Sequence, residues 1–189
     1  MRFKDYMKKD MIEFFNKRTN RHIELVQKYA KKIETFDDVF KGLIKRTAVH
    51  DASKFKEPEY SPYLYITWMY ECKRQGKPFK VPKEIKDKMH EATIHHVKAN
   101  RHHAEFHDDN ASINKEDRDA PIDKIIDASK MTNIDIGEQV ADWLAMSEEK
   151  QTNMHTWAKK NINVRWKWNK EQENLINKLI DQFGDKNEI

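Results

Sequence analysis

The stretch His50-Asp51-Ala52-Ser53-Lys54, read together with His95-His96 and His102-His103, decides the fold and the chemistry expected of this chain. Five of its nine histidines lie between residues 90 and 103. The two histidine pairs stand seven residues apart, close to two helical turns, so both pairs can lie on one face of a helix. Imidazole nitrogen and carboxylate oxygen together suit Mn, Fe, Ni, Co, Zn or, with the help of water, Mg. The pattern predicts a site for one or two divalent ions.

Apolar residues on either side of this stretch recur every three or four positions, as they do in amphipathic helices. Thr19 or Asn20 is available as the N-cap of the first of these helices. The expected helices cover residues 23–33, 36–44, 63–72, 82–99, 122–129, 136–149 and 164–183, and residues 108–121 are expected to form a polar loop. Because strong strand alternation is missing, we expect an all-α protein, a single-domain bundle of about six to eight helices.

The composition fits one domain over residues 1–189, with a core over about 19–150 and a C-terminal helix over about 164–183. The net charge of +4 comes from interspersed residues of both signs, which is weak evidence for a nucleic-acid partner. The four glycines form no phosphate-cradling loop, which argues against P-loop and Rossmann chemistry. Cys72 is the single cysteine, and no apolar run approaches the ~18 residues of a membrane span. We therefore expect a cytoplasmic protein without a membrane partner.

Two further residues, His22 and Asp142, are candidates for the same site. His22 lies on the apolar side of its expected helix, where a lone histidine is more often a satisfied core residue than a ligand. Asp142 stands between Ala141 and Trp143 in a helix that is expected to be buried, where an unpaired carboxylate is unfavourable by several kcal/mol. Either a metal ion or a basic partner would satisfy Asp142.

The order of these residues resembles the metal-ligand order of the HD superfamily, all-helical metal-dependent phosphohydrolases. Its members present a histidine, an adjacent His-Asp pair, further histidines and a late aspartate, which here would be His22, His50-Asp51, the 95–103 histidines and Asp142. A closer resemblance is to an uncharacterised family of bacteria and phages. Its motifs are His-Asp-x-Ser-Lys-Phe, then Glu-Tyr, His-x-x-x-Asn-x-His-His-x-Glu and Asp-Trp-x-Ala, and the resemblance covers roughly residues 19 to 170.

The resemblance implies a divalent-metal site and a role for several neighbouring side chains. The implied ligands are His22, His50, Asp51, His96, His103 and Asp142, with His95 and His102 as alternatives. The preference for His96 rests on its spacing to Asn100 and His103. Lys54 would stabilise phosphate charge, Asn100 would orient a water or an imidazole, and Glu59 or Glu105 would act as base or orienter. The implied reaction is hydrolysis of a phosphorylated small molecule, with a nucleotide as the expected substrate, by metal-activated water.

Two other functions remain open at this stage. Some proteins of the HD clan, similar to inositol oxygenase, bind a pair of iron ions and activate dioxygen, and six His/Asp ligands would serve that chemistry equally. The chain could instead be a non-enzymatic helical module that binds nucleic acid. Residues 159–168 interleave lysine and arginine with Trp166 and Trp168, a mixture that can bind single strands, although on a helix the two indoles would point to different faces and one of them is expected to pack in the core.

Overall fold

The computed structural model describes residues 3–113 and 124–184, and helices dominate this part of the chain. The α-helices are α1 (Phe3–Phe36), α2 (Leu43–Thr47), α3 (Tyr60–Arg74), α4 (Lys83–Ala99), α5 (Ala104–His107), α6 (Asn133–Lys150), α7 (Met154–Asn161) and α8 (Lys170–Phe183). Two short 3-10 helices, η1 (Asp38–Phe40) and η2 (Ala52–Phe55), flank α2. The strands β1 (Ile126–Asp127) and β2 (Trp166–Lys167) form one parallel pair. The mostly helical, all-α architecture is confirmed.

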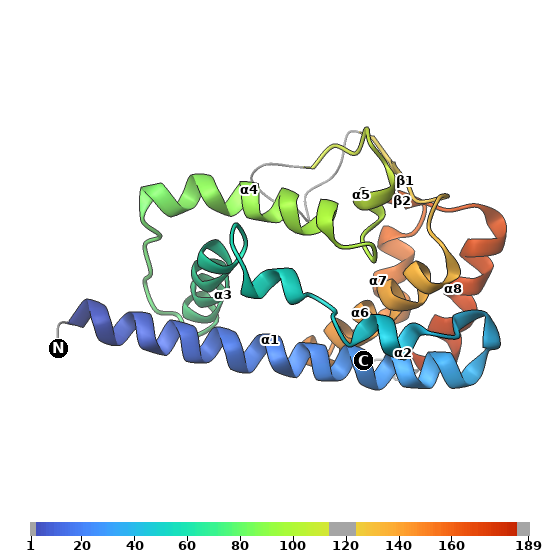
Figure 1. Cartoon of the computed structure of the whole chain (residues 1–189), viewed down its shortest axis with the longest axis horizontal. Helices are drawn as coiled ribbons and strands as arrows, with labels where there is room; N and C mark the ends of the chain where they lie inside the picture. The colour runs from blue at the N-terminus through green and yellow to red at the C-terminus, as the bar shows by residue number, and fades with distance from the viewer. Residues whose placement is uncertain (1–2, 114–123, 185–189) are drawn as a thin grey trace.

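Helix α1 runs along one whole side of the molecule, and the other elements gather in two groups against it (Figure 1). At its N-terminal end α3 contacts both α1 and α4. Further along, α6 packs against α1 and α2, and α7 and α8 cover α6. Among the described residues no helix is long and apolar enough to cross a bilayer.

The buried residues of α1 belong to two separate apolar clusters, and this separation positions the site. Met11 and Phe15 pack with Leu64 of α3 in the smaller cluster. Val26 and Ile33, spaced at helical intervals, enter the larger one, which α6 and α8 complete. Between the two clusters α1 buries polar side chains instead, with Thr19 and His22 3% and 5% exposed. A polar layer therefore crosses the protein at the level of His22.

Three expected helices need correction. The helix expected over residues 122–129 is wrong as far as it can be compared. Residues 124–129 are not helical and contain β1, and residues 122–123 fall outside the described residues. In this segment Ile126 and Ala128 are buried and their neighbours exposed, which is the two-residue period of a strand. The expected helix 164–183 begins only at Lys170, because Asn169 and Gln172 form a capping box at that point. The expected helix 36–44 is interrupted at Gly42, which has φ of 99°.

The two histidine pairs do not share a helix face, contrary to the prediction. Helix α4 ends at Ala99, and Asn100 caps it in an extended conformation. His102 and His103 therefore lie in the turn before α5, while His95 and His96 remain on α4. The first helix also starts well before Thr19 or Asn20, so neither residue caps it. The expected helices 63–72, 82–99 and 136–149 correspond to α3, α4 and α6.

Candidate metal centre

The centre is organised around Asp51, which occupies a turn between α2 and η2. Its φ of 56° lies in the left-handed region, which is uncommon for residues other than glycine but tolerated better by aspartate than by most. The turn buries both His50 and Asp51, which are 2% and 1% exposed. A strained backbone at a buried carboxylate often marks a functional site.

Three imidazoles present the same ring atom to the Asp51 carboxylate. The Nε2 atom of His96 lies 3.3 Å from Oδ1 of Asp51, and that of His102 lies 3.8 Å from the same oxygen. The Nε2 atom of His50 lies 3.7 Å from Oδ2. The rings of His50 and His102 are 4.4 Å apart between centroids. Histidines from α4, from the turn before α5 and from the turn after α2 thus converge on one carboxylate.

The opposite nitrogen of each ring is held by a buried glutamate. Glu138 Oε1 of α6 lies 3.0 Å from Nδ1 of His50 and 3.5 Å from Nδ1 of His102. Glu59 Oε2 lies 2.8 Å from Nδ1 of His96. An ionised carboxylate can only accept, so each Nδ1 carries a proton, and a neutral ring then turns the lone pair of Nε2 toward Asp51.

Burial and the charge of Lys54 lower the pKa of His96 to about 4, so its neutral ring places a nitrogen lone pair against a carboxylate, which is repulsive unless a cation lies between them. Nε2 of His50, Nε2 of His102 and Oδ1 of Asp51 are among the buried atoms of the described residues that have no hydrogen-bond partner. Each such group is unfavourable by roughly 1–3 kcal/mol. One or two divalent ions would satisfy all three atoms, so the residues fit a metal. Among the described residues, three sets of side chains have ligand atoms within 4.8 Å of one another: His96, His102 and His103; His22, His50 and Asp51; and His50, His102 and Glu138.

Lys54 places a positive charge against the carboxylate of Asp51. Its ammonium donates to Asp51 Oδ2 and lies 5.4 Å from the ring centre of Tyr63. Burial opposes ionisation of Asp51, but the charge of Lys54 outweighs it and holds the pKa of Asp51 well below the usual value. Asp51 is therefore an anion with Oδ2 held by lysine and Oδ1 turned toward His96 and His102.

His22 and Asp142 form an ion pair beside this cluster. Their atoms Nε2 and Oδ1 are 3.0 Å apart, and Nδ1 of His22 lies 3.4 Å from Glu149 Oε2. Burial opposes protonation of His22, but the hydrogen bonds to the two carboxylates outweigh it and raise its pKa to about 9. The same bond holds the pKa of Asp142 below its usual range despite burial. For His22 to ligate an ion, one of its two carboxylate contacts must open.

The other predicted site residues take different positions. Asn100 donates to the Ser53 hydroxyl at 2.9 Å, and Ser53 donates to Glu59 Oε2 at 3.0 Å, so these two residues brace the glutamate that holds His96. His103 stacks against His102 with ring centres 4.1 Å apart. Glu105 is buried, and its Oε1 accepts from the Trp166 indole at 3.3 Å.

His95 stays at the outer edge of the cluster, where its side chain is 43% exposed and contacts Glu59 Oε1 at 2.7 Å. The structure therefore brings together His22, His50, Asp51, His96, His103 and Asp142, and it adds His102 to the same cluster.

Sequence reasoning missed Glu138, although a signal was present. Glu138 follows Asp135 by three positions and precedes Asp142 by four, so the three carboxylates share one face of α6. The Asp135 carboxylate accepts hydrogen bonds from two guanidinium nitrogens of Arg101, at 3.1 and 3.0 Å. These bonds connect the turn that carries His102 and His103 to α6. An acidic stripe on a largely apolar helix predicts buried partners for its carboxylates.

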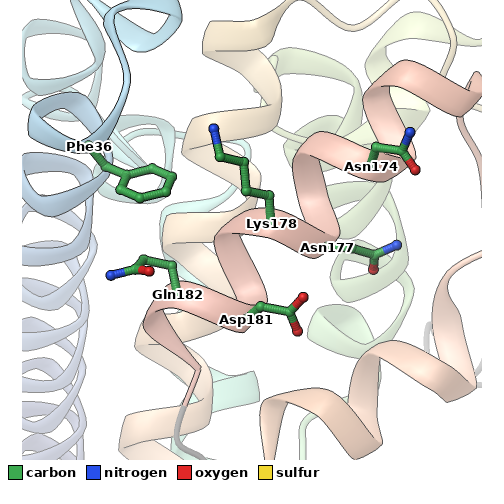
Figure 2. Close-up of a pocket in the computed structure, with 6 residues that line it drawn as sticks. All are labelled: Phe36, Asn174, Asn177, Lys178, Asp181 and Gln182. Atoms are coloured by element: carbon green, nitrogen blue, oxygen red, sulfur yellow. The ribbon is translucent and has the colours of Figure 1, made fainter.

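A surface pocket of about 580 Å³ lies elsewhere, against Phe36 and the polar face of α8 (Figure 2). Phe36 follows His22 by 14 residues on α1, which corresponds to about 21 Å of helix. Its lining side chains are Phe36, Asn174, Asn177, Lys178, Asp181 and Gln182. They include no histidine, so this pocket does not belong to the candidate centre.

The chain belongs to DUF5662, a family of unknown function, whose sequence pattern matches residues 11–183. No curated protein and no solved structure is similar enough to count as a match.

Proposed function

We propose that this protein is a metal-dependent phosphohydrolase of the HD type that acts on a phosphorylated small molecule. One observation carries the proposal: three buried imidazoles, fixed at Nδ1 by glutamates, direct Nε2 toward one aspartate of a His-Asp pair. The order of His22, His50-Asp51 and Asp142 along the chain supports the HD assignment.

His96, His102 and His103 would hold one ion, and His50 and Asp51 would supply ligands of a second site. This nitrogen-rich set favours Mn, Fe, Co, Ni or Zn over Mg. His22 and Asp142 would complete the second site once their ion pair opens. A bound ion would lower the pKa of a water molecule and polarise a phosphoryl oxygen.

The chain's own residues would bind and orient the phosphate. Lys54, Asp142 and Glu149 have side chains 18%, 16% and 13% exposed, so the substrate would approach on their side of the centre. Lys54 is the cation on this side, and its ammonium would turn from Asp51 to the phosphate as charge develops there. Arg101 would not take that role, because Asp135 already binds its guanidinium.

An iron-dependent oxygenase is the second candidate. The observation in its favour is that two of the candidate ligand sets meet at neighbouring residues, since His50 and Asp51 of one set face His102 and His96 of the other. Two adjacent ions with histidine-rich ligands would suit dioxygen chemistry as well as hydrolysis. The nucleic-acid module is weakened, because Trp166 and Trp168 are each only 4% exposed and cannot stack on bases without unfolding.

The test is a screen of nucleotides and other phosphate esters with Mn, Co, Ni, Mg and Fe(II), run with and without oxygen. Phosphate release without oxygen is the expected result. Product formation only with iron and oxygen would replace the hydrolase by the oxygenase. His96→Gln should abolish the activity, while His155→Gln, at a histidine outside the candidate centre, should preserve it.

A further inference from the structure

Glu138 is a buried carboxylate whose two oxygens serve different partners. Its side chain lies on α6, and the residue is 3% exposed. Oε1 faces Nδ1 of both His50 and His102, at 3.0 and 3.5 Å. Oε2 faces a guanidinium nitrogen of Arg46 at 3.6 Å. A charge buried this deeply requires such partners, and here the partners include two imidazoles of the candidate centre.

His50, His102 and Glu138 form one of the groups whose ligand atoms lie close enough to hold an ion, but the contact of Glu138 with His50 is a hydrogen bond, and its oxygen occupies the position that an ion on Nδ1 would need. Hydrogen bonds to ring nitrogens place the acceptor close to the N–H direction, and Glu138 Oε1 lies 3.0 Å from Nδ1 of His50. A metal on that nitrogen would have to lie on the same line at roughly 2.0–2.1 Å. That position overlaps the glutamate oxygen. The ion-facing atom of His50 is therefore Nε2, which has no hydrogen-bond partner.

We propose that Glu138 is a positioning residue that fixes His50 and His102 as Nδ1–H tautomers, with both Nε2 lone pairs directed at the ion site beside Asp51. The proposal rests on the proposed metal centre. Without an acceptor at Nδ1, each ring can carry its proton on either nitrogen or rotate. Glu59 makes the corresponding contact to His96, at 2.8 Å. The centre would thus be prepared from two sides, by α6 and by the start of α3.

Metal affinity gives the first test, with the full-length protein and Co(II) or Mn(II) as the probe. Glu138→Leu removes the acceptor and nearly preserves volume, and Glu138→Gln keeps one acceptor oxygen but loses the charge. Loss of a carboxylate that orients a ligating histidine weakens metal binding about 10–100-fold. We expect the larger loss for Leu and a smaller one for Gln. Glu148→Gln is the matched control, because the side chain of this glutamate of α6 accepts from Lys28 and Tyr29 and belongs to none of the candidate ligand sets of the described residues.

Nitrogen NMR of labelled histidine in the metal-free protein gives the second test. At about pH 8, wild type should show His50 as the Nδ1–H tautomer, and Glu138→Leu should shift it toward Nε2–H. The His50→Gln variant assigns the signal. A merely structural role for Glu138 would leave the tautomer unchanged, and that result would overturn the proposal. So would equal metal affinity in wild type and Glu138→Leu.

The two tests separate this proposal from the proposed function. The tautomer is measured without metal or substrate, so it holds even if no phosphate ester is hydrolysed. If Glu138→Leu does not fold, Glu138→Gln carries the affinity measurement, because the loss of the carboxylate charge should still weaken metal binding, and wild-type affinity in Glu138→Gln would then overturn the proposal. Metal bound through Nδ1 in wild type would make Glu138 a ligand and overturn its positioning role.

Discussion

Replacing Asp51 by asparagine should remove the stabilisation that a divalent ion gives to this protein. Asp51 is 1% exposed, its Oδ2 accepts from Lys54, and its Oδ1 has no hydrogen-bond partner. The amide has nearly the same shape as the carboxylate but no charge. It therefore keeps the packing and removes the anion on which His50, His96 and His102 converge.

The size of the effect follows from ligand linkage. An ion present at about 100 times its dissociation constant stabilises the folded state by about 2.7 kcal/mol. In a chain of this size each kcal/mol raises Tm by roughly 2–4 °C, so wild type should gain about 5–11 °C. In Asp51→Asn the same ion concentration should lie near or below the variant's dissociation constant for the ion. The rise in Tm on adding the ion should then fall to about 1 °C or less.

Thermal unfolding of chelator-treated protein, with and without Mn(II) or Co(II), measures both gains. Asp181→Asn is the control, because Asp181 has a side chain 72% exposed and lies on α8, away from the centre. An equal rise in Tm for wild type and Asp51→Asn would show that the ion binds elsewhere. No rise in wild type with any of the metals would refute the reasoning, and Lys54 alone would then account for the buried Asp51.

Three further predictions concern stability and catalysis. Asp135→Asn should destabilise the protein by about 1–3 kcal/mol near neutral pH. Burial opposes ionisation of Asp135, but hydrogen bonds from Arg101 outweigh it and lower its pKa in the folded state. This stabilisation is therefore present above the pKa of the unfolded state, near 3.9, and is lost as pH falls through the pKa of the folded state. Urea unfolding should show the stability difference between wild type and Asp135→Asn shrinking in acid. Gly137→Ala should lower stability by up to about 2 kcal/mol, because a Cβ there would lie 2.8 Å from Phe40 Cδ1, and a rise in Tm would contradict this. Lys54→Met should keep metal binding but slow hydrolysis about 10²–10³-fold, and loss of metal would show a different role.

The helices could be predicted wherever apolar periodicity decided the structure, and the errors arose where local contacts decided it. Ile136, Val140 and Leu144 are all buried, so the 3.6-residue period located α6 correctly. Trp166 and Trp168 are two residues apart and both buried, which fits a strand and not a helix. That strand is fixed by pairing with a segment some forty residues earlier, where Ile126 N bonds to Arg165 O at 3.0 Å. Such a long-range pairing leaves little signal in a sequence window.

The residues of the candidate site could be named from their types and order, but their partners could not. His50-Asp51, His96 and His102 stand out in the sequence because a purely structural role seldom requires so many histidines close together. Glu138 does not stand out, since a glutamate in a helix is ordinarily a solvated residue. Its burial depends on three elements meeting at α6, which only the folded chain reveals. The sequence likewise could not decide between His102 and His103, because the two are adjacent. In the folded chain His102 lies 3.8 Å from Asp51 Oδ1.

His96 is the residue that most strongly requires a cation. Its Nδ1 lies 2.8 Å from Glu59 and its Nε2 lies 3.3 Å from Asp51, so both nitrogens face carboxylates. Burial and the charge of Lys54 outweigh these carboxylates and lower the pKa of His96 to about 4, which leaves a neutral ring with one proton near pH 7. The amide nitrogen of Asn100 also approaches Nδ1, at 3.2 Å, but it is a donor that serves the Ser53 hydroxyl and the His96 carbonyl, so the proton of Nδ1 goes to Glu59. The lone pair of Nε2 is then directed at an anion, and a divalent ion between them would turn this repulsion into two bonds.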